Sequence, residues 1–528
     1  MFRDARAVPD RSTLDADICI VGGGAAGITI ARELAGTGLA VLLLEAGGFE
    51  PDPATESLNE GESIGVKYRP VGTSRLRYLG GATQHWSGWC RPLDVIDFER
   101  RDDVPYSGWP FSRALLDPFY MRAQEICELG PYQYDPAYWE SRGLGRQVHL
   151  RRDRFVSTVY QLSPPTFFGT AYRADLERAD GVTVLLFANV VEIPCAENAD
   201  AVTGLQVATL AGNRFAVRAR QYVLAAGGLE NARILLASRS TVPTGLGNQH
   251  DLVGRFFMEH LHINTAFFMP SDVPHDAAFY SRRQSFGRFG VIGALRLSDA
   301  CLRQERLLGL SVFLEPAIFR PESVQQAQQA DGYQSLVHLM DSVRNRRYPQ
   351  GFLRHLWNVV TDPAATGTTT YWRLFMRGDG FQLAVRTEQA PNPDSRVTLS
   401  SDRDALGVPR IRLDWRLTDL DIRTIERGWE LLAQELGRAG LGRVHMPETM
   451  VEQPWQDYLW GGAHHIGTTR MADDPRQGVV DRDSRVHGLA NLYVAGSSVF
   501  PTGGFSNPTL TIVALALRLA RHLKELPR

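Results

Sequence analysis

Two adjacent histidines are the residues in this sequence whose types most directly suggest chemistry. His464 and His465 lie in the stretch GGAHHIGTTRMADD, residues 461–474. A neutral imidazole, with an unperturbed pKa of about 6.5, can accept a proton near physiological pH. Neighbouring side chains on a strand point to opposite faces, so we expect at most one of the two to face any one pocket. Without further context, histidines in such a polar turn are more often surface or structural residues.

A glycine-rich turn near the N-terminus indicates a dinucleotide site. In VGGGAAG, Gly22, Gly24 and Gly27 form the pattern G-x-G-x-x-G between a predicted strand and a predicted helix. Such glycines let the backbone approach a pyrophosphate, and the helix N-terminus offers free N–H groups. Glu45 ends the next predicted strand and can accept hydrogen bonds from ribose hydroxyls. Glycine turns can serve packing alone, but here strand, turn, helix, second strand and acid coincide. This unit does not decide between NAD and FAD.

The elements that must position these residues are spread along the whole chain. The strand at residues 16–24, the helix at 25–36 and the strand at 40–48 form a parallel β-α-β unit. Residues 221–238 repeat the order of apolar strand, glycine turn and helix, and residues 491–503 supply another apolar strand. A strongly periodic helix is predicted over residues 507–526. We therefore predict an α/β fold with one doubly wound sheet.

The sequence between these segments has a different pattern of hydrophobic and polar residues. From about Phe267 to Met446, short alternating strands are interrupted by a helical stretch around residues 323–343. This pattern predicts a second, discontinuous domain of α+β type, built on an antiparallel sheet.

The amino-acid composition argues against several classes of protein. Among 528 residues, 44% are hydrophobic and 22% charged, which argues against a disordered or fibrous chain. The formal net charge of −2 gives no general attraction to nucleic acid or anionic lipid, so neither is an expected partner. Five cysteines without paired spacing suggest neither a disulfide framework nor a metal site. No signal peptide or membrane-spanning run is recognised, so a cytoplasmic location is expected, although a subunit exported with a signal-bearing partner would look the same.

Four separated segments resemble the glucose-methanol-choline (GMC) oxidoreductase family of flavoproteins. They are DADICIVGGGAAGITIARELAGTGLAVLLLEAGG, RYLGGATQHWSGWCRPL, QYVLAAGGLENARILLASR and the stretch from His464 to Ala520 that begins HHIGTTRM. HDLVGRFFMEH and NPDSRVTLS also resemble family blocks. The HW pair after the second glycine pair and the asparagine near the C-terminus are most similar to the branch of pyranose oxidase and related sugar and glycoside oxidoreductases. Residues 267–371 carry no such resemblance.

The resemblance implies FAD as cofactor and two discontinuous domains. A Rossmann-like FAD-binding domain would comprise residues 1–110, 180–266 and 455–528. A substrate-binding domain would comprise residues 111–179 and 267–454. Beyond the glycines and Glu45, the family pattern implies FAD contacts from His85, Ser87, Val190, Val191, Ala226, Gly496, Pro508 and Thr509.

The resemblance also separates the two histidines. The family's active histidine lies four residues before the threonine of a GTxRM block, which is His464 here. The second catalytic position falls in FSNPT, at Asn507. His464 would be the base beside flavin N5, and Asn507 would hold the substrate oxygen. Because Asn507 precedes Pro508, it could equally be a helix N-cap with proline as the first helical residue, and the two roles are compatible. The positive end of that helix dipole would then stabilise the anionic reduced flavin.

The loop GGATQHWSGWC raises the question of a covalent flavin. ATQHW resembles the block of pyranose oxidase whose histidine is joined to the flavin 8α carbon, which places His85 at the linking position. The alternative is non-covalent contact, as in many family members. Ser87 would face flavin N5 and O4, or be an ordinary loop serine. Gln84, where the relative has threonine, and the pair Trp89 and Cys90 depart from the pattern.

Substrate contacts are less well defined. Glu388 or Gln389 could line the pocket, but strand alternation allows only one of them to face inward. Gln389 is the candidate we select, and His465 is a second candidate, with a structural role as its alternative. Tyr371 and Trp372 could stack on a sugar or belong to the core. The basic and aromatic stretch Arg344 to Trp357 could be a lid, a docking surface, a membrane contact or a solvated helix face.

Together these patterns predict an FAD-dependent alcohol oxidoreductase. A secondary alcohol of a sugar, glycoside or polyol would lose a hydride to flavin N5 and its hydroxyl proton to His464. Oxygen, a quinone or a redox partner could reoxidise the flavin, and a homo-oligomer is possible. The alternatives are a choline-like or steroid alcohol, a non-redox FAD-dependent lyase, and a flavin-stabilised binding or electron-carrying subunit.

Overall fold

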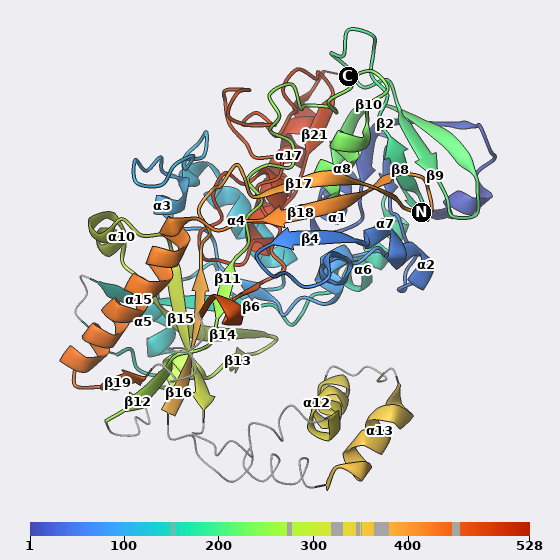
Figure 1. Ribbon diagram of the computed structural model, residues 1–528. Coiled ribbons are helices and arrows are strands. Elements are labelled where there is room, and N and C mark those ends of the chain that lie inside the picture. Colours follow the sequence, from blue (N-terminus) through green and yellow to red (C-terminus); the bar gives the residue numbers. More distant parts are fainter. Residues whose placement is uncertain are drawn as a thin grey trace.

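A computed structural model gives the architecture shown in Figure 1. It describes residues 1–148, 150, 154–271, 277–317, 331–344, 349, 351–363, 380–445 and 455–527. Tyr371 and Trp372, considered above as sugar-stacking residues, lie outside these ranges. Within them, no helix combines the length and the apolar composition that a bilayer span needs.

The first sheet contains the predicted β-α-β unit. Strand β2 (Thr13–Val21) leads through the glycine turn to α1 (Ala25–Leu34), and β3 (Val41–Leu44) returns parallel to β2. All four residues of β3 are buried, as expected for a central parallel strand covered on both faces. The other strands of this sheet are β1 (Phe2–Asp4), β7 (Val182–Leu186), β8 (Asn189–Glu192), β9 (Leu205–Ala208), β10 (Arg214–Leu224) and β21 (Leu492–Val494). The order β7-β3-β2-β10-β21 is parallel throughout, which confirms the doubly wound expectation.

The C-terminal helix covers this sheet together with α1. Helix α17 (Thr509–Glu525) packs against α1 and against α4 (Asp117–Ile126). Its apolar residues include Leu510, Val513 and Leu517, all buried. The predicted boundaries placed residues 111–179 in the substrate domain, but α4 lies on the first sheet's helix layer.

The second sheet is antiparallel at every pairing between its strands, as expected for the substrate domain. Among the described residues its strands are β5 (Trp89–Cys90), β6 (Phe155–Leu162), β11 (Leu261–Ile263), β12 (Phe267–Pro270), β13 (Gln284–Phe286), β14 (Phe289–Leu297), β15 (Leu310–Ala317), β16 (Gly380–Thr387), β19 (Gly442–His445) and β20 (Trp460–Gly461). Strands β5, β11 and β20 fall in segments predicted for the FAD-binding domain. Helix α15 (Asp419–Arg438) lies along this sheet and buries Ile425, Leu432 and Leu436 at helical spacing (Figure 1).

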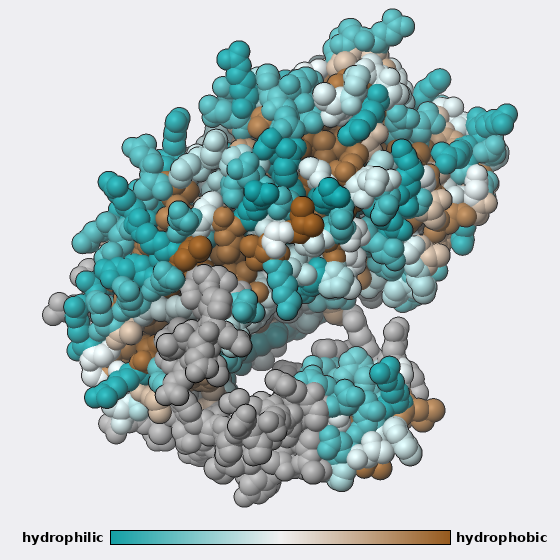
Figure 2. All heavy atoms as spheres, viewed as in Figure 1, coloured by the Kyte–Doolittle hydropathy of each residue, from teal (hydrophilic) through white to brown (hydrophobic). Residues whose placement is uncertain are grey.

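Short helices fill the connections, and two longer ones stand apart. The short helices are α2 (Pro53–Glu56), α3 (Val95–Phe98), α5 (Pro136–Ser141), α6 (Phe168–Ala171), α7 (Arg173–Arg178), α8 (Glu230–Ala237), α9 (Ala278–Ser281) and α10 (Asp299–Glu305). Helices α12 (Asp331–Arg344) and α13 (Phe352–Thr361) pack against each other, and part of their surface is hydrophobic (Figures 1 and 2). Leu353, Trp357 and Val360 of α13 are largely exposed.

A buried arginine joins helix α8 to a third, smaller sheet. Strands β17 (Arg396–Arg403), β18 (Pro409–Trp415) and β4 (Gly61–Gly65) form this third sheet. Arg233 of α8 is 3% exposed and donates to Asp404 at 2.6 Å and to Glu230 at 3.1 Å. Its Nε also donates to the carbonyl of Pro409 at 2.8 Å. The Arg233 guanidinium therefore binds both ends of the β17–β18 turn, at Asp404 and at Pro409.

We predict that Arg233→Met destabilises the protein strongly. Glu230 keeps Arg75 and Arg77, but Asp404 loses its counter-charge, and breaking a buried ion pair in this way typically costs about 3–5 kcal/mol. The free energy of urea unfolding measures this effect. Arg416→Met is the matched control, because Arg416 pairs with Asp414 on the surface, where solvent screens the ion pair and its loss has little effect on stability. Equal losses in the two variants would contradict the prediction.

Candidate active site

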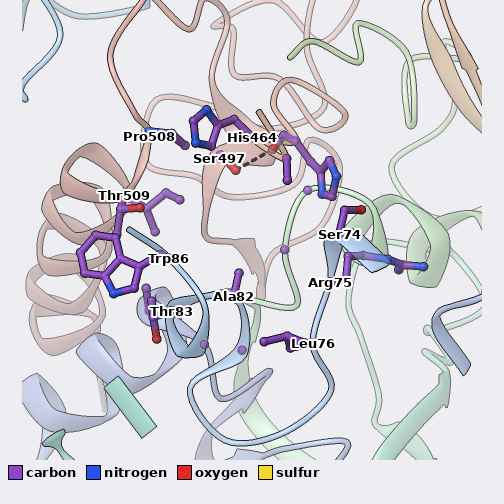
Figure 3. A pocket seen from close by; sticks show the side chains of 18 of the residues that line it. Ser74, Arg75, Leu76, Ala82, Thr83, Trp86, His464, Ser497, Pro508 and Thr509 are labelled. Atoms are coloured by element: carbon purple, nitrogen blue, oxygen red, sulfur yellow. Dashed lines mark hydrogen bonds between the residues drawn. The ribbon is translucent and has the colours of Figure 1, made fainter. Parts of the chain in front are cut away.

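A cavity of about 740 Å³ lies where the first and second sheets meet. Its size is in the upper part of the range typical of ligand sites, roughly 300–1,000 Å³. The first sheet supplies the glycine turn and Glu45, and the second sheet supplies His262, Phe313 and Arg386. Figure 3 shows Trp86 and Thr509 on one side of this cavity and Ser74 and Arg75 on the other.

The glycine turn has the close approaches that its motif predicts. Gly22 has a φ of +108°, and a Cβ there would lie 2.6 Å from the carbonyl oxygen of Ala225 on the neighbouring strand. Gly24 lines the cavity, and a Cβ there would meet no protein atom within 4 Å. Gly27 does not line the cavity; a Cβ there would lie 1.9 Å from the carbonyl oxygen of Gly22. Gly27 therefore allows the helix to pack on the turn, while Gly24 leaves room for a ligand.

Glu45 is held at the cavity wall by backbone hydrogen bonds. Its carboxylate accepts from the N–H of Gly23 at 2.8 Å and from the N–H of Gly47 at 3.0 Å. Burial raises the pKa of Glu45, and these two hydrogen bonds and the charge of Arg77 oppose that rise. The side chain is thus fixed in orientation between the glycine turn and the end of β3.

Most of the other residues predicted to contact FAD also line the cavity. They are His85, Ser87, Val190, Ala226, Gly496, Pro508 and Thr509. Val191 does not line it. The side chains of His85 and Ser87 are exposed to the cavity rather than packed in the protein.

These residues fit FAD. The starts of two helices line the cavity, α1 through Gly24 to Ala26 and α17 through Pro508 and Thr509. Helix N-termini present free N–H groups and a positive dipole end, which suit a pyrophosphate and an electron-rich ring. Glu45 adds the acceptor that a ribose requires.

His464 and Asn507 are brought together at this cavity. The side-chain amide of Asn507 lies 3.1 Å from Nε2 of His464, and both residues line the wall. Helix α17 begins at Thr509 after Pro508, and no side chain caps it. The N-cap interpretation of Asn507 is therefore not what the structure shows, because its amide is directed to the histidine.

His465 also contributes to the wall, but its ring is engaged by other protein groups. The expected strand alternation does not apply, because Ala463 has a φ of +60° and the segment is irregular. Nε2 of His465 donates to the hydroxyl of Tyr68 at 3.0 Å, and that hydroxyl donates to Glu259. Its backbone carbonyl accepts from Ser497 at 2.6 Å (Figure 3). This arrangement favours the structural role of His465 over substrate contact.

The structure corrects the placement of Gln389. Its side chain is 1% exposed, accepts from the backbone N–H of Glu259 and from the indole of Trp415, and donates to the carbonyl of Arg416. Glu388 is buried too and accepts from the N–H groups of Gly309 and Gly504. Neither residue lines the cavity. Both lie beyond the end of β16, where their side chains accept hydrogen bonds from backbone N–H groups.

Several residues at the site were not predicted from the sequence. Glu259 accepts a hydrogen bond from the backbone N–H of His464 at 2.8 Å, and Nδ1 of His260 lies 2.8 Å from Nδ1 of His464. Arg69, His262 and Arg386 line the cavity near the same ring. The segment HDLVGRFFMEH, which ends in Glu259 and His260, was the available signal, because it resembles a family block.

Comparison with protein families agrees with this site. Residues 17–245 match the model described as FAD dependent oxidoreductase, and residues 391–516 match the model described as GMC oxidoreductase. The second match contains both His464 and Asn507. The C-terminal match is to GMC oxidoreductases, and the N-terminal match is to FAD-dependent oxidoreductases. The FAD that the resemblance implied is therefore the cofactor of this oxidoreductase.

Individual relatives cover most or part of the chain. The 6'''-hydroxyparomomycin C oxidase of Streptomyces lividus is 25% identical over 96% of this chain and 91% of its own length. The C-glycoside 3-oxidase of Microbacterium trichothecenolyticum is 36% identical over 31% of this chain and 29% of its own. A crystal structure of formate oxidase superposes with a TM-score of 0.56 at 19% identity, covering 98% of this chain and 99% of that one. That superposition supports the overall fold of this oxidoreductase.

We predict that Glu45→Gln weakens FAD binding by about 10- to 100-fold. The amide presents an N–H₂ where the carboxylate accepted an N–H, and loss of a hydrogen bond to a charged group costs about 1.5–3 kcal/mol. Titration of apo-protein, expressed under riboflavin limitation, with FAD measures the affinity. Glu50→Gln makes the same chemical change at an exposed position outside the cavity. If both variants bind FAD equally well, Glu45 is not a cofactor ligand.

Proposed function

We propose that this FAD-dependent oxidoreductase oxidises a secondary alcohol of a sugar, glycoside or polyol to a ketone. The observation that supports this most is the 3.1 Å contact between the Asn507 amide and Nε2 of His464 at the cavity wall. A base and a hydrogen-bond donor side by side are what an alcohol needs at its hydroxyl oxygen.

The roles of the two side chains follow from their atoms. FAD, when bound, supplies the hydride acceptor. Nε2 of His464 accepts the hydroxyl proton, and the Asn507 amide donates to the oxygen on which negative charge develops. A positioned base of this kind typically contributes about 10²–10⁴ in rate.

The electrostatics keep this base in its active form. Burial holds the pKa of His464 well below its ordinary value, and the charges of neighbouring histidines, Arg386 and Arg69 act in the same direction. A histidine with a lowered pKa is neutral at pH 7, so it can accept a proton. The same two guanidinium groups favour an oxygen that is losing its proton.

The cavity wall that the second sheet forms suits a polyhydroxylated substrate. The rings of Trp89 and Phe313 both line it and meet edge to face at 5.0 Å. Glu315 and Arg386 line it as well and offer an acceptor and a donor for hydroxyl groups. The relatives named for oxidation of a C-glycoside and of 6'''-hydroxyparomomycin C support the same substrate class.

Anaerobic reduction of the bound flavin tests the proposed function. The purified holoenzyme is mixed with a panel of sugars, glycosides, polyols, choline and a sterol, and the flavin absorbance is followed. We expect bleaching with a member of the first three groups, and ketone formation at one carbon by NMR. Admission of air then distinguishes oxygen from a quinone or redox partner as acceptor. Bleaching only by choline or the sterol would overturn the substrate class, and no bleaching by any alcohol would favour a non-redox role.

His464→Gln in the same assay tests the base. We expect the rate of flavin reduction to fall by about 10²–10⁴ while FAD content is retained, since glutamine cannot accept the proton. His250→Gln is the matched control, because His250 is exposed and outside the cavity. A His464→Gln variant that reduces its flavin at the wild-type rate would exclude this base.

His85 is our candidate for a covalent link to FAD. It lines the cavity, and its ring is exposed there instead of packed against protein. We expect acid-precipitated, washed protein to keep its yellow colour, and the His85→Ala variant to lose it. A colourless wild-type pellet would show that FAD is held without a bond.

A further inference from the structure

A line of hydrogen bonds runs from the buried His260 through His464 at the cavity wall. Nε2 of His260 lies 2.8 Å from the carbonyl oxygen of Gly504 and 3.3 Å from that of Gly503. Nδ1 of His260 lies 2.8 Å from Nδ1 of His464. Nε2 of His464 then meets the Asn507 amide. Three side chains thus connect a backbone turn to the cavity.

The direction of these bonds follows from what each atom can do. A carbonyl oxygen only accepts, so Nε2 of His260 carries a hydrogen and donates it to Gly504. A neutral imidazole has one N–H, so Nδ1 of His260 is an acceptor. The contact between the two rings then requires a hydrogen on Nδ1 of His464. If His464 is neutral as well, its Nε2 carries no hydrogen and presents a lone pair, which accepts from the Asn507 amide.

Both rings are neutral at physiological pH. His260 is 2% exposed, and burial lowers its pKa to about 4 despite the two carbonyl contacts. His464 is held well below its ordinary pKa, mainly by burial. Because each neutral ring has one N–H donor and one acceptor nitrogen, the donor and acceptor in every hydrogen bond of this line are fixed.

The neighbouring residues hold this line in place. Glu388 accepts the backbone N–H of Gly504 at 3.2 Å, which fixes the turn that accepts from His260. Glu259, the residue before His260, accepts the backbone N–H of His464. One short segment therefore holds both the backbone and the ring of His464.

We propose that His260 is a positioning residue that fixes the tautomer of His464, so that its unprotonated Nε2 faces the substrate hydroxyl beside Asn507. The inference rests on the proposed function for its catalytic consequence, but the tautomer itself is a property of the protein without substrate. A base held in the wrong tautomer presents an N–H where a lone pair is required, which can cost up to about 10⁴ in kcat.

Direct observation of the tautomers tests the structural half of the proposal. In holoenzyme labelled with ¹⁵N-histidine, long-range ¹H–¹⁵N correlation spectra near pH 7 distinguish protonated from bare ring nitrogens. We expect His464 to carry its hydrogen on Nδ1 and His260 on Nε2, with assignments from the His464→Gln and His260→Asn spectra. A hydrogen on Nε2 of His464 in the wild type would overturn the proposal, whatever the substrate is.

Two substitutions of His260 test the kinetic half. In His260→Asn, the amide oxygen can take the place of Nδ1 and still accept from His464. In His260→Gln, the amide reaches the Nε2 position, so the donor to Gly504 is kept and the acceptor is lost. We expect kcat for flavin reduction to be at least about 10-fold lower in the glutamine variant than in the asparagine variant, with similar KM.

The pH profile separates positioning from a general loss of structure. An acceptor at Nδ1 stabilises the imidazolium form of His464, so its loss should move the acid limb of kcat/KM to lower pH in His260→Gln only. His262, His465, Arg69 and Arg386 also face or influence His464, and they are the same in both variants. FAD content and thermal midpoint are compared first. Equal kcat and equal pH profiles in the two variants would overturn the role of His260.

Discussion

One backbone pairing determines how the active site is assembled. Met258 and Ile466 exchange two hydrogen bonds of 3.0 Å, each N–H donating to the other's carbonyl. Both residues are buried, so the pairing is shielded from water. It sets the register between the segment that carries Glu259 and His260 and the segment that carries His464. With a shift of one residue, the carboxylate of Glu259 would no longer reach the N–H of His464, and the two rings would not meet.

The site combines this register with an unusual concentration of buried titratable groups. His260, His464 and His465 have pKa values lowered by burial, whereas burial raises the pKa of Glu259 to about 7. Each such group is costly to bury unless it is hydrogen-bonded. Here every one of them has a partner among the described residues, and the partners are backbone groups, the Tyr68 hydroxyl or each other. The protonation pattern is therefore set by the fold rather than by the solvent.

The sequence was informative where chemistry and local structure coincide. The glycine turn, the buried strand that follows it and Glu45 predicted one half of the cofactor site, because each signal depends on a few neighbouring residues. His464 and Asn507 were assigned through the resemblance, and the structure brings their side chains together. Glu259 and His260 were missed, because their importance arises only from the pairing with residues more than 200 positions away. Gln389 was misplaced because strand alternation ended at Thr387, and α4 was assigned to the wrong layer because its partner is the C-terminal helix.

The position of the α12–α13 pair has a consequence for how such an enzyme can diversify. The chain leaves β15 at Ala317 and enters β16 at Gly380, and these two residues are directly opposite each other in the antiparallel ladder. Everything between them is topologically a single hairpin connection. Segments of different length and composition can be exchanged at this point without altering the pairing of the sheet that carries Phe313 and Arg386 to the cavity. Natural variation in this connection can change which molecules the enzyme contacts, while the residues that line the cavity keep their positions in the sheet.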